Sequence, residues 1–294
     1  MDYKLLIVLV LKLSISLIVF GLGLNATLGD ALSVLRRPRE LGRAFLSMNV
    51  IMPALALTMA LNVNLHPAVK IVLVALSVAP VPPIFPRTAL KEGGREDYAI
   101  GLLVAMTLLS IVVIPVTMKI FQPLVGVHLR EPVSSVAWLV LIRILLPLSA
   151  GIALRSLTPG LAKRLARPVG TLATVLLISC VLPVLFVSAR EIWSLIGDGT
   201  ILAFSVFVVA GLAIGYWLGG PDSEDRRVLS LATSSRHPGL ALAIAHANFP
   251  NQKLGMAAMA LYLIINAVLL TLLSGKHKGK TAAAAPSTED RKAA

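Results

Sequence analysis

The sequence is poor in cysteine, in aromatic residues and in charge. Its 294 residues include a single cysteine, Cys180, which excludes an intrachain disulfide and a thiolate metal cluster. Aromatic residues make up 5% and are not interleaved with a basic patch, so the net charge of +13 does not indicate nucleic-acid binding. Charged residues make up only 14%, compared with about 25% in an average soluble domain. This scarcity of charge argues against a soluble fold.

The motifs of common enzyme classes are also missing. The sequence contains no G-x-S-x-G, no H-E-x-x-H and no P-loop. A hydrolase embedded in the membrane would need paired Asp, paired His or Ser–Lys elements within its apolar segments, and none is placed in that way. The sequence therefore predicts a protein that is not an enzyme.

Apolar residues are abundant instead. They make up 57% of the chain, and the mean hydropathy is +0.87. A transmembrane helix needs about 20 mostly apolar residues, and about nine such runs occur. They lie at 5–25, 44–63, 69–86, 98–120, 135–154, 168–188, 200–218, 228–247 and 254–274. The first run is longer than a signal-peptide core, and no A-x-A site follows it, so we expect it to be retained. The composition thus predicts an all-α integral membrane protein whose partner is the lipid bilayer.

Basic residues alternate between the loops. One set of loops holds Arg36, Arg37, Arg39 and Arg43; Arg87, Lys91 and Arg95; Arg155, Lys163, Arg164 and Arg167; and Arg226 and Arg227. The positive-inside rule puts these loops in the cytoplasm, with the N-terminus outside and the C-terminus inside. Residues 275–294 are expected to form a disordered cytoplasmic tail. Short loops, with no evident transit peptide, favour a bacterial inner (plasma) membrane.

Two of the apolar runs are interrupted. The third ends in the segment 79–87, which contains four prolines and cannot continue a helix. The eighth contains Thr-Ser-Ser-Arg-His-Pro-Gly at 233–239. Unwound backbone at membrane depth is tolerated only where protein or a water-filled cavity satisfies it, and one break in each half of the chain is typical of a transporter site. A simple loop at a membrane face is the alternative for each break.

The candidate substrate-binding residues follow from these breaks. They are Arg236, His237, Ser234, Ser235, Thr233, Pro82, Pro83 and Pro86, together with Arg143 in the fifth run. A charge within a span is costly unless it faces a cavity or a partner, and acidic partners are scarce in the spans. An anionic substrate would supply the missing countercharge. The alternatives are neutralisation of Arg236 by a carbonyl or carboxylate and snorkelling of Arg143 to an interface.

Several segments resemble the bile acid:sodium symporter family. They are the G-L-G-L-N-A-T-L-G-D run at 21–30, the basic turn at 35–39, Pro53 in the following span, the end of the third span at 90–93 and the eighth span at 232–245. The resemblance implies inverted repeats in a nine-helix form, with the two broken helices crossing. It also implies one transporter domain, 1–274, divided into a panel (1–43 and 121–198) and a core (44–120 and 199–274). Substrate would bind between panel and core.

The eighth span departs from the family pattern at the positions that help to hold sodium. The family has Glu, Gln and Asn there, whereas this sequence has Ala232, Arg236 and His237. We therefore expect a secondary transporter of a small organic anion that works by alternating access without the usual sodium coupling and without a cofactor. Proton coupling through His237 is an open possibility. The alternatives are a non-transporting sensor or scaffold on the same fold, or an arsenite-type efflux permease. The latter would carry a cysteine in its first broken helix, but Cys180 lies in another span.

Overall fold

The computed structural model describes residues 3–125, 138, 141–248 and 254–283, and every regular element among these residues is helical. The first part of the chain forms α1 (Tyr3–Gly23), α2 (Leu28–Leu32), α3 (Pro38–Phe45), the π-helix η1 (Leu46–Ile51), α4 (Met52–Asn62), α5 (Pro67–Val78), α6 (Phe85–Lys91) and α7 (Glu96–Val125). The second part forms the π-helix η2 (Leu141–Leu145), α9 (Leu146–Leu157), α10 (Pro159–Val187), α11 (Ala189–Ser194), α12 (Thr200–Leu218), α13 (Ser223–Ser234), α14 (Pro238–Asn248) and α15 (Gly255–Ala283).

Four described helices are long and apolar enough to cross a membrane. They are Pro38–Asn62, Glu96–Phe121, Thr200–Leu218 and Gly255–Leu272. Three shorter apolar helical segments accompany them: Lys12–Gly23, Pro67–Val78 and Leu146–Leu157. The predicted all-α membrane fold is confirmed, although the expected fifth span, 135–154, lies partly outside the described residues.

Two element boundaries differ from the expected ones. The span predicted at 44–63 already begins at Pro38, because α3, η1 and α4 continue into one another. The π-turns of η1 precede Pro53, which has no amide hydrogen to donate to the preceding turn. An irregular turn accommodates this missing hydrogen bond. At the other end of the chain, α15 extends to Ala283, so the first part of the predicted tail is helical, as its Ala and Lys content permits. Residues 284–294 lie outside the described part.

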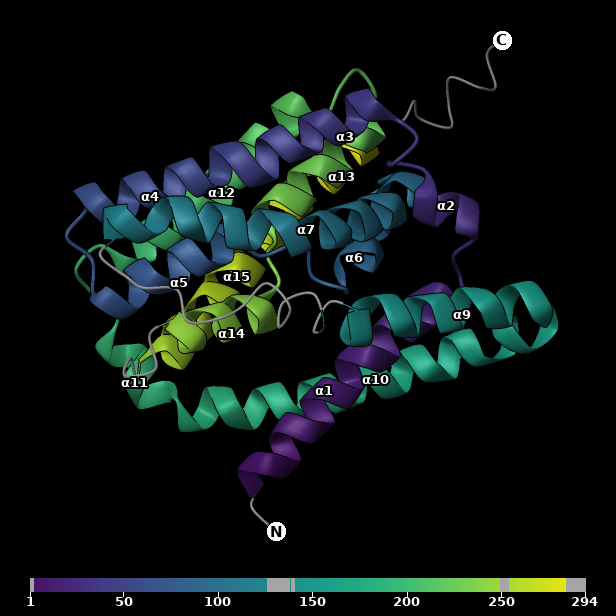
Figure 1. The fold of residues 1–294 in the computed structure, drawn as a ribbon, viewed down its shortest axis with the longest axis horizontal. Coiled ribbons are helices and arrows are strands. Elements are labelled where there is room, and N and C mark those ends of the chain that lie inside the picture. The colour runs from purple at the N-terminus through teal and green to yellow at the C-terminus, as the bar shows by residue number, and fades with distance from the viewer. Residues whose placement is uncertain (1–2, 126–137, 139–140, 249–253, 284–294) are drawn as a thin grey trace.

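The helices form two layers (Figure 1). The three-helix layer consists of α1, α9 and α10, which contact one another along the lower side of the view. Gly23 of α1 meets Gly151 of α9 so closely that a Cβ built on Gly23 would lie 3.0 Å from the Gly151 Cα. Small residues allow such close approach of membrane helices, where dispersion rather than the hydrophobic effect drives packing. The remaining helices, from α3 to α7 and from α12 to α15, form the larger layer.

Within the larger layer, α12 and α13 lie in close contact along their length. Gly211 and Gly215, four residues apart on α12, face the backbone of α13. A Cβ added to Gly211 would lie 2.8 Å from the Ser234 Cα, and one added to Gly215 would lie 2.6 Å from the Ser230 Cα. This G-x-x-x-G pair therefore fixes where α13 ends and where the second break begins.

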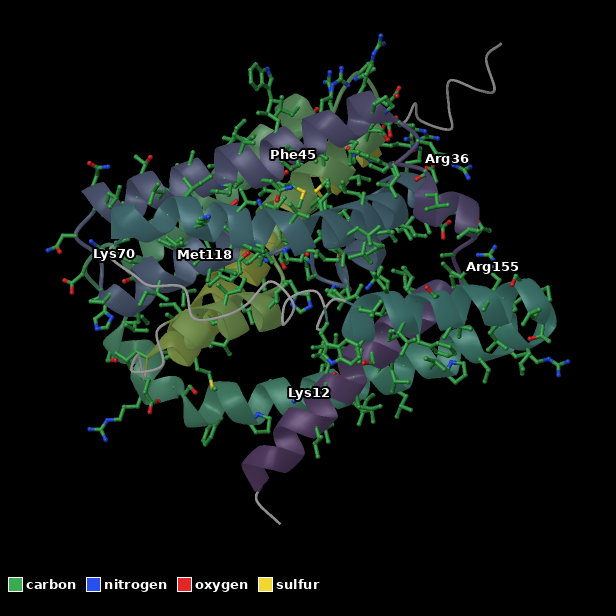
Figure 2. All side chains as sticks on the ribbon, in the orientation of Figure 1. Lys12, Arg36, Phe45, Lys70, Met118 and Arg155 are labelled. Atoms are coloured by element: carbon green, nitrogen blue, oxygen red, sulfur yellow. The ribbon has the colours of Figure 1, made fainter. Side chains whose placement is uncertain are left out.

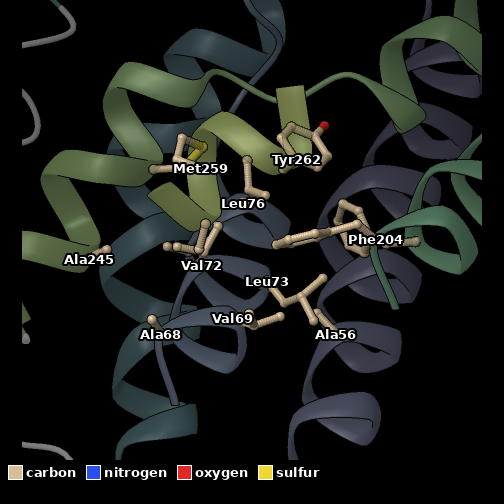
Figure 3. Packing of buried hydrophobic residues seen from close by; sticks show 14 of the residues in the cluster. Ala56, Ala68, Val69, Val72, Leu73, Leu76, Phe204, Ala245, Met259 and Tyr262 are labelled. Carbon is tan, nitrogen blue, oxygen red and sulfur yellow. The ribbon is translucent and has the colours of Figure 1, made fainter. Parts of the chain in front are cut away.

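Apolar packing then holds the second half of α5. Buried side chains of α5, α12 and α15 interdigitate around Leu73, Leu76 and Phe204 (Figure 3). The Phe204 and Tyr262 rings meet edge to face, with their centroids 5.8 Å apart. This cluster anchors the helix that leads into the first break, and it buries Tyr262 next to the second.

The basic loops gather at one end of the molecule. Figure 2 shows Arg36 and Arg155 at that end and Lys70 at the opposite one. Arg227 lies close to Gly93, and Arg43 lies close to Gly220, so loops from both halves of the chain meet there. We refer to this region as the basic end.

Candidate functional site

The two broken helices meet at their breaks. Residues Ala79–Ile84 separate α5 from α6, and Ser235–His237 separate α13 from α14. The backbone N–H of His237 donates to the carbonyl of Pro80 over 2.8 Å. The predicted interruptions are therefore present, and segments almost 160 residues apart in sequence are joined by a direct backbone bond. We refer to this region as the crossing.

Arg236 lies at the centre of the crossing. Its side chain is almost completely buried, with 1% of the residue exposed. The guanidinium donates from Nη1 to the carbonyl of Ala79 over 3.2 Å and from Nη2 to the carbonyl of Met48 over 2.9 Å. One side chain thus connects the second break to the first break and to η1. Nε has no hydrogen-bond partner among the described residues.

Four hydroxyl groups around the crossing, those of Ser47, Thr233, Ser234 and Tyr262, are hydrogen-bonded within the protein. The hydroxyls of Ser47 and Thr233 lie 2.7 Å apart, and Thr233 also donates to the carbonyl of Leu229. Tyr262 donates to the carbonyl of Ser234 over 3.1 Å. Thr233, Ser234 and Ser235 are all buried. These groups stabilise the end of α13, where the last turn leaves carbonyls without helical partners.

His237 caps the helix that follows. Its Nδ1 accepts a hydrogen bond of 3.2 Å from the backbone N–H of Leu240, near the start of α14. This geometry assigns the ring proton to Nε2, because Nδ1 must keep its lone pair to accept. Protonation of Nδ1 would break the cap, so the predicted proton coupling through His237 would have to disrupt the start of α14.

The proline-rich break differs in extent from the prediction. Pro82 and Pro83 lie within it, whereas Pro86 belongs to the first turn of α6. The first turn of a helix has free N–H groups in any case, so proline fits there without losing a bond. Arg143 lies in η2, next to the three-helix layer, and its side chain is outside the described part. Of the predicted site residues, those of the two breaks lie together, and Arg143 comes from a separate element.

The crossing carries a positive charge that its hydrogen bonds do not neutralise. Carbonyl dipoles satisfy the guanidinium hydrogens without cancelling the positive charge. Arg236 has no ion pair with any carboxylate in the described part of the chain. The guanidinium bonds to the carbonyls of Ala79 and Met48, and its positive charge would repel a sodium ion placed at the same two carbonyls. The crossing therefore presents a fixed positive charge inside an apolar layer.

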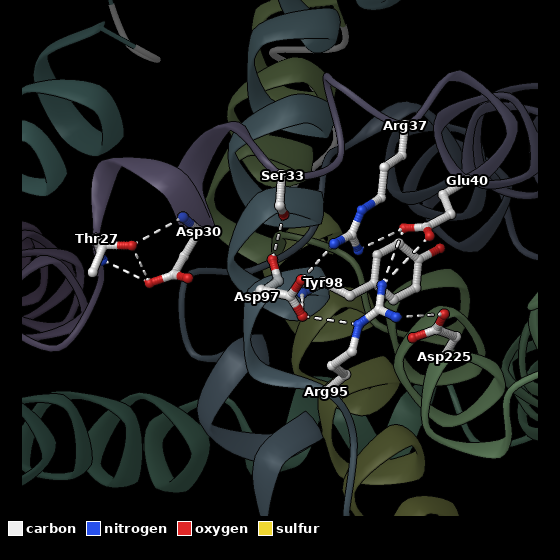
Figure 4. A network of polar contacts seen from close by, with 9 residues as sticks. All are labelled: Thr27, Asp30, Ser33, Arg37, Glu40, Arg95, Asp97, Tyr98 and Asp225. Atoms are coloured by element: carbon white, nitrogen blue, oxygen red, sulfur yellow. Dashed lines mark hydrogen bonds and ion pairs between the residues drawn. The ribbon is translucent and has the colours of Figure 1, made fainter.

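A second polar cluster, which the sequence did not reveal, lies at the basic end (Figure 4). Arg95 contacts Asp97 at 2.8 Å, Glu40 at 3.2 Å and Asp225 at 3.2 Å, and Arg37 contacts Asp97 at 3.1 Å. We refer to these five residues as the carboxylate cluster. It joins the starts of α3, α7 and α13. Each of its members sits in a loop or a first helical turn, so sequence spacing alone gave no sign that they meet.

Burial and charge act on the carboxylate cluster in opposite directions. Burial would lower the pKa of Arg95, but Asp225, Asp97 and Glu40 raise it above its ordinary value. Burial raises the pKa of the Asp225 carboxyl to about 6, although Arg95 lowers it. Asp225 is 4% exposed, and its Oδ1 has no hydrogen-bond partner among the described residues. One carboxyl of this cluster is therefore set to gain a proton close to neutral pH.

Comparison with protein families gives one result that bears on this geometry. Residues 12–195 match the model of the Sodium Bile acid symporter family. The match begins within α1 and ends just after α11, so it contains the first break but not the second, where Arg236 lies. A search of curated proteins found no match to the chain.

Proposed function

Because the chain belongs to the sodium bile acid symporter family, we propose that it carries a small organic anion across the bilayer by alternating access. Members of this family are membrane transporters and not enzymes. The observation that carries the proposal is Arg236, a buried guanidinium at the crossing of two broken helices whose partners are carbonyls only.

The charge of the cargo follows from electrostatics. An anion that enters an apolar layer without compensation pays a large solvation penalty, which a conformational change in a dry site would not tolerate. A fixed cation at the crossing offsets part of that penalty. Arginine suits this role because it stays protonated even when it is buried. The family name points to bile acids as one class of organic anion to test.

Arg236 also takes the place of a bound cation in this proposal. A sodium ion at a helix crossing would gather carbonyl oxygens from separate segments, and the guanidinium gathers the carbonyls of Ala79 and Met48 in the same way. Transport would then need no sodium. Because His237 is used as a helix cap, we assign no proton coupling to it.

The two layers correspond to the moving parts. We assign the three-helix layer to the panel and the larger layer to the core, which moves relative to it. Close backbone contacts within each layer, such as Gly23 to Gly151 and Gly211 to Ser234, support rigid units of this kind. The basic end would face the cytoplasm, because the positive-inside rule applies to its short loops.

The experiment is uptake into proteoliposomes at constant ionic strength, with sodium or choline as the only cation. Cholate serves as a bile acid and benzoate as a smaller carboxylate. We expect the parent protein to take up an organic anion equally in sodium and in choline, and we expect Arg236→Gln to lose this uptake in choline. Arg190→Gln is the matched control, since Arg190 is exposed on α11. Uptake that requires sodium would contradict the role of Arg236, and no uptake of any organic anion would contradict transport.

One alternative is also supported by a specific observation. Both terminal nitrogens of Arg236 are already bonded, and the hydroxyls around it are engaged, which is what a non-transporting sensor or scaffold would show. Binding without uptake distinguishes this alternative. In that case an organic anion would raise the unfolding temperature of the purified protein, while the proteoliposomes would take up neither cholate nor benzoate.

A further inference from the structure

Arg87 bridges the two layers. It lies in α6, directly after the proline-rich break of the larger layer, and its side chain is half-buried. Its guanidinium reaches the three-helix layer at Gly21 of α1 and Gly170 of α10. A Cβ built on Gly170 would lie 2.7 Å from the Arg87 Nη2, and one built on Gly21 would lie 3.1 Å from the same atom. The absence of side chains at these two positions makes the room that the guanidinium occupies.

Arg87 has no countercharge among the residues that the structure describes. It makes no hydrogen bond and no ion pair with any residue that the structure describes, in contrast to Arg95 and Arg37 at the basic end. The atoms nearest a Cβ built on Gly21 are the Arg87 Nη2, the Val169 Cγ1 and the Gly170 backbone nitrogen, and none of them belongs to an acidic residue. Partial burial removes some of the water that would otherwise solvate this cation, and an anionic group can compensate for that loss. The position is accounted for if an anion binds there.

We propose that Arg87, framed by Gly21 and Gly170, contacts the anionic group of the cargo where the two layers meet. The inference rests on the proposed transport of an organic anion and assigns the recognition contact within it. The expected group is a carboxylate or a sulfonate, because the planar guanidinium fork matches two oxygens of such a group. The two arginines then have different tasks. Arg236 holds the crossing through the carbonyls that it binds, and Arg87 meets the cargo.

The test measures the electrostatic potential at the Arg87 guanidinium directly. In a Cys180→Ser background, Gly170→Cys places a single thiol beside it. The full-length protein in proteoliposomes is treated with an anionic reagent, sulfonatoethyl methanethiosulfonate, or with its cationic trimethylammonium counterpart. Each rate is normalised to the rate with free 2-mercaptoethanol. One elementary charge at a distance of about 5 Å in a wet site favours the anionic reagent over the cationic one by about tenfold.

We expect Arg87→Gln to remove this preference and Arg164→Gln to leave it intact. Arg164 is an exposed residue on the same helix as Gly170, and its replacement deletes the same charge farther away. Gly21→Cys repeats the measurement on α1 and covers the case in which Gly170→Cys fails to fold. Benzoate should also slow the reaction of the anionic reagent when Arg87 is present and should have no effect in Arg87→Gln, because cargo bound at Arg87 would shield the thiol. The assignment is overturned by a preference that survives Arg87→Gln, by a lack of reaction with both reagents at both positions, or by a reaction that benzoate does not slow. These results leave the uptake of organic anions unaffected, so failure of this site is distinguishable from failure of the proposed function.

Discussion

The crossing and the basic end both contain a highly bonded arginine, but the partners are of different kinds. Arg236 donates to two backbone carbonyls, whereas Arg95 lies within 3.2 Å of three carboxylates. Carbonyls satisfy hydrogen-bond donors and leave the charge uncompensated, while carboxylates do both. The crossing therefore keeps a field that acts on an anion, and the carboxylate cluster links helix ends without such a field. Both sites join distant segments, but of the two arginines only Arg236 lacks a carboxylate partner among the described residues.

The largest effect is expected at the crossing. Arg236→Gln removes two charge-assisted hydrogen bonds, each worth about 1.5–3 kcal/mol, and takes the guanidinium donor away from the carbonyls of Ala79 and Met48. We expect a clear loss of thermal stability that sodium partly restores, because free oxygen ligands can then bind a cation. The measurement is the unfolding temperature in sodium chloride and in choline chloride.

One further variant and the unaltered protein serve as controls for this measurement. Arg236→Lys should be intermediate, because a single ammonium cannot bridge two carbonyls as the guanidinium does. The unaltered protein should unfold at the same temperature in both salts. An Arg236→Gln protein that is as stable as the parent in choline would show that the crossing does not depend on this cation.

A smaller loss of stability is expected when the carboxylate cluster is altered. Arg95→Gln leaves Asp225 buried beside Glu40 and Asp97 without the central cation, which should cost about 2–3 kcal/mol. The double variant Arg95→Gln with Asp225→Asn should recover part of the loss, since the buried charge is then absent. High salt should reduce the difference in the free energy of unfolding between the parent and Arg95→Gln, because salt screens the charges of a partly exposed cluster. Equal salt sensitivity for Arg95→Gln and Arg236→Gln would remove the distinction between the two sites.

The carboxylate cluster should also respond to pH. Burial raises the pKa of Asp225 to about 6 from its ordinary value of 3.8, with Glu40, Asp222 and Asp97 acting in the same direction and Arg95 opposing them. Between these pH values the folded protein holds a proton that the unfolded chain has lost, so ionised Asp225 lowers the free energy of unfolding above about pH 6. Asp225→Asn should therefore be more stable than the parent near pH 7.5.

This advantage should shrink as the pH falls through about 6 and vanish near pH 4, where the carboxyl of the parent is protonated as well. Unfolding temperatures of both proteins across this range provide the test. A constant difference at every pH would mean that Asp225 acts through the shape of its hydrogen bonds and not through its charge. No comparable pH response should come from replacing Arg236.

The smallest effect is expected at the cap of α14. His237→Ala removes the acceptor for the Leu240 N–H and should cost about 1 kcal/mol, whereas His237→Asn keeps a capping group and should cost less. Both variants should transport with the pH dependence of the parent. If His237→Asn alone flattened the pH profile of uptake, proton coupling through this histidine would be supported and the capping role would be incomplete.

The breaks were predictable because they are local. Four prolines within 79–87, and a Pro-Gly pair after Arg236, interrupt a helix wherever they lie in a fold. The residue at which the proline-rich break ends was less predictable, since Pro86 fits the first turn of α6. The sequence did not suggest the role that we propose for Arg87, because a basic residue next to a span is usually a loop residue that sets topology. Only its closeness to Gly21 and Gly170 distinguishes it from Arg36 or Arg39.

The sequence by itself determined the membrane class, the two interrupted helices and the presence of a cation at one of them, because these depend on the length of apolar runs and on the backbone limits of single residues. The tertiary structure alone decided which groups meet that cation. Met48 and Ala79 lie far from Arg236 in the chain, and no pattern of spacing pairs their carbonyls with it. The same holds for Asp225 beside Arg95 and for Gly170 beside Arg87. Such pairings are set by the packing of distant helices, which small residues like Gly211 and Gly23 bring within contact distance.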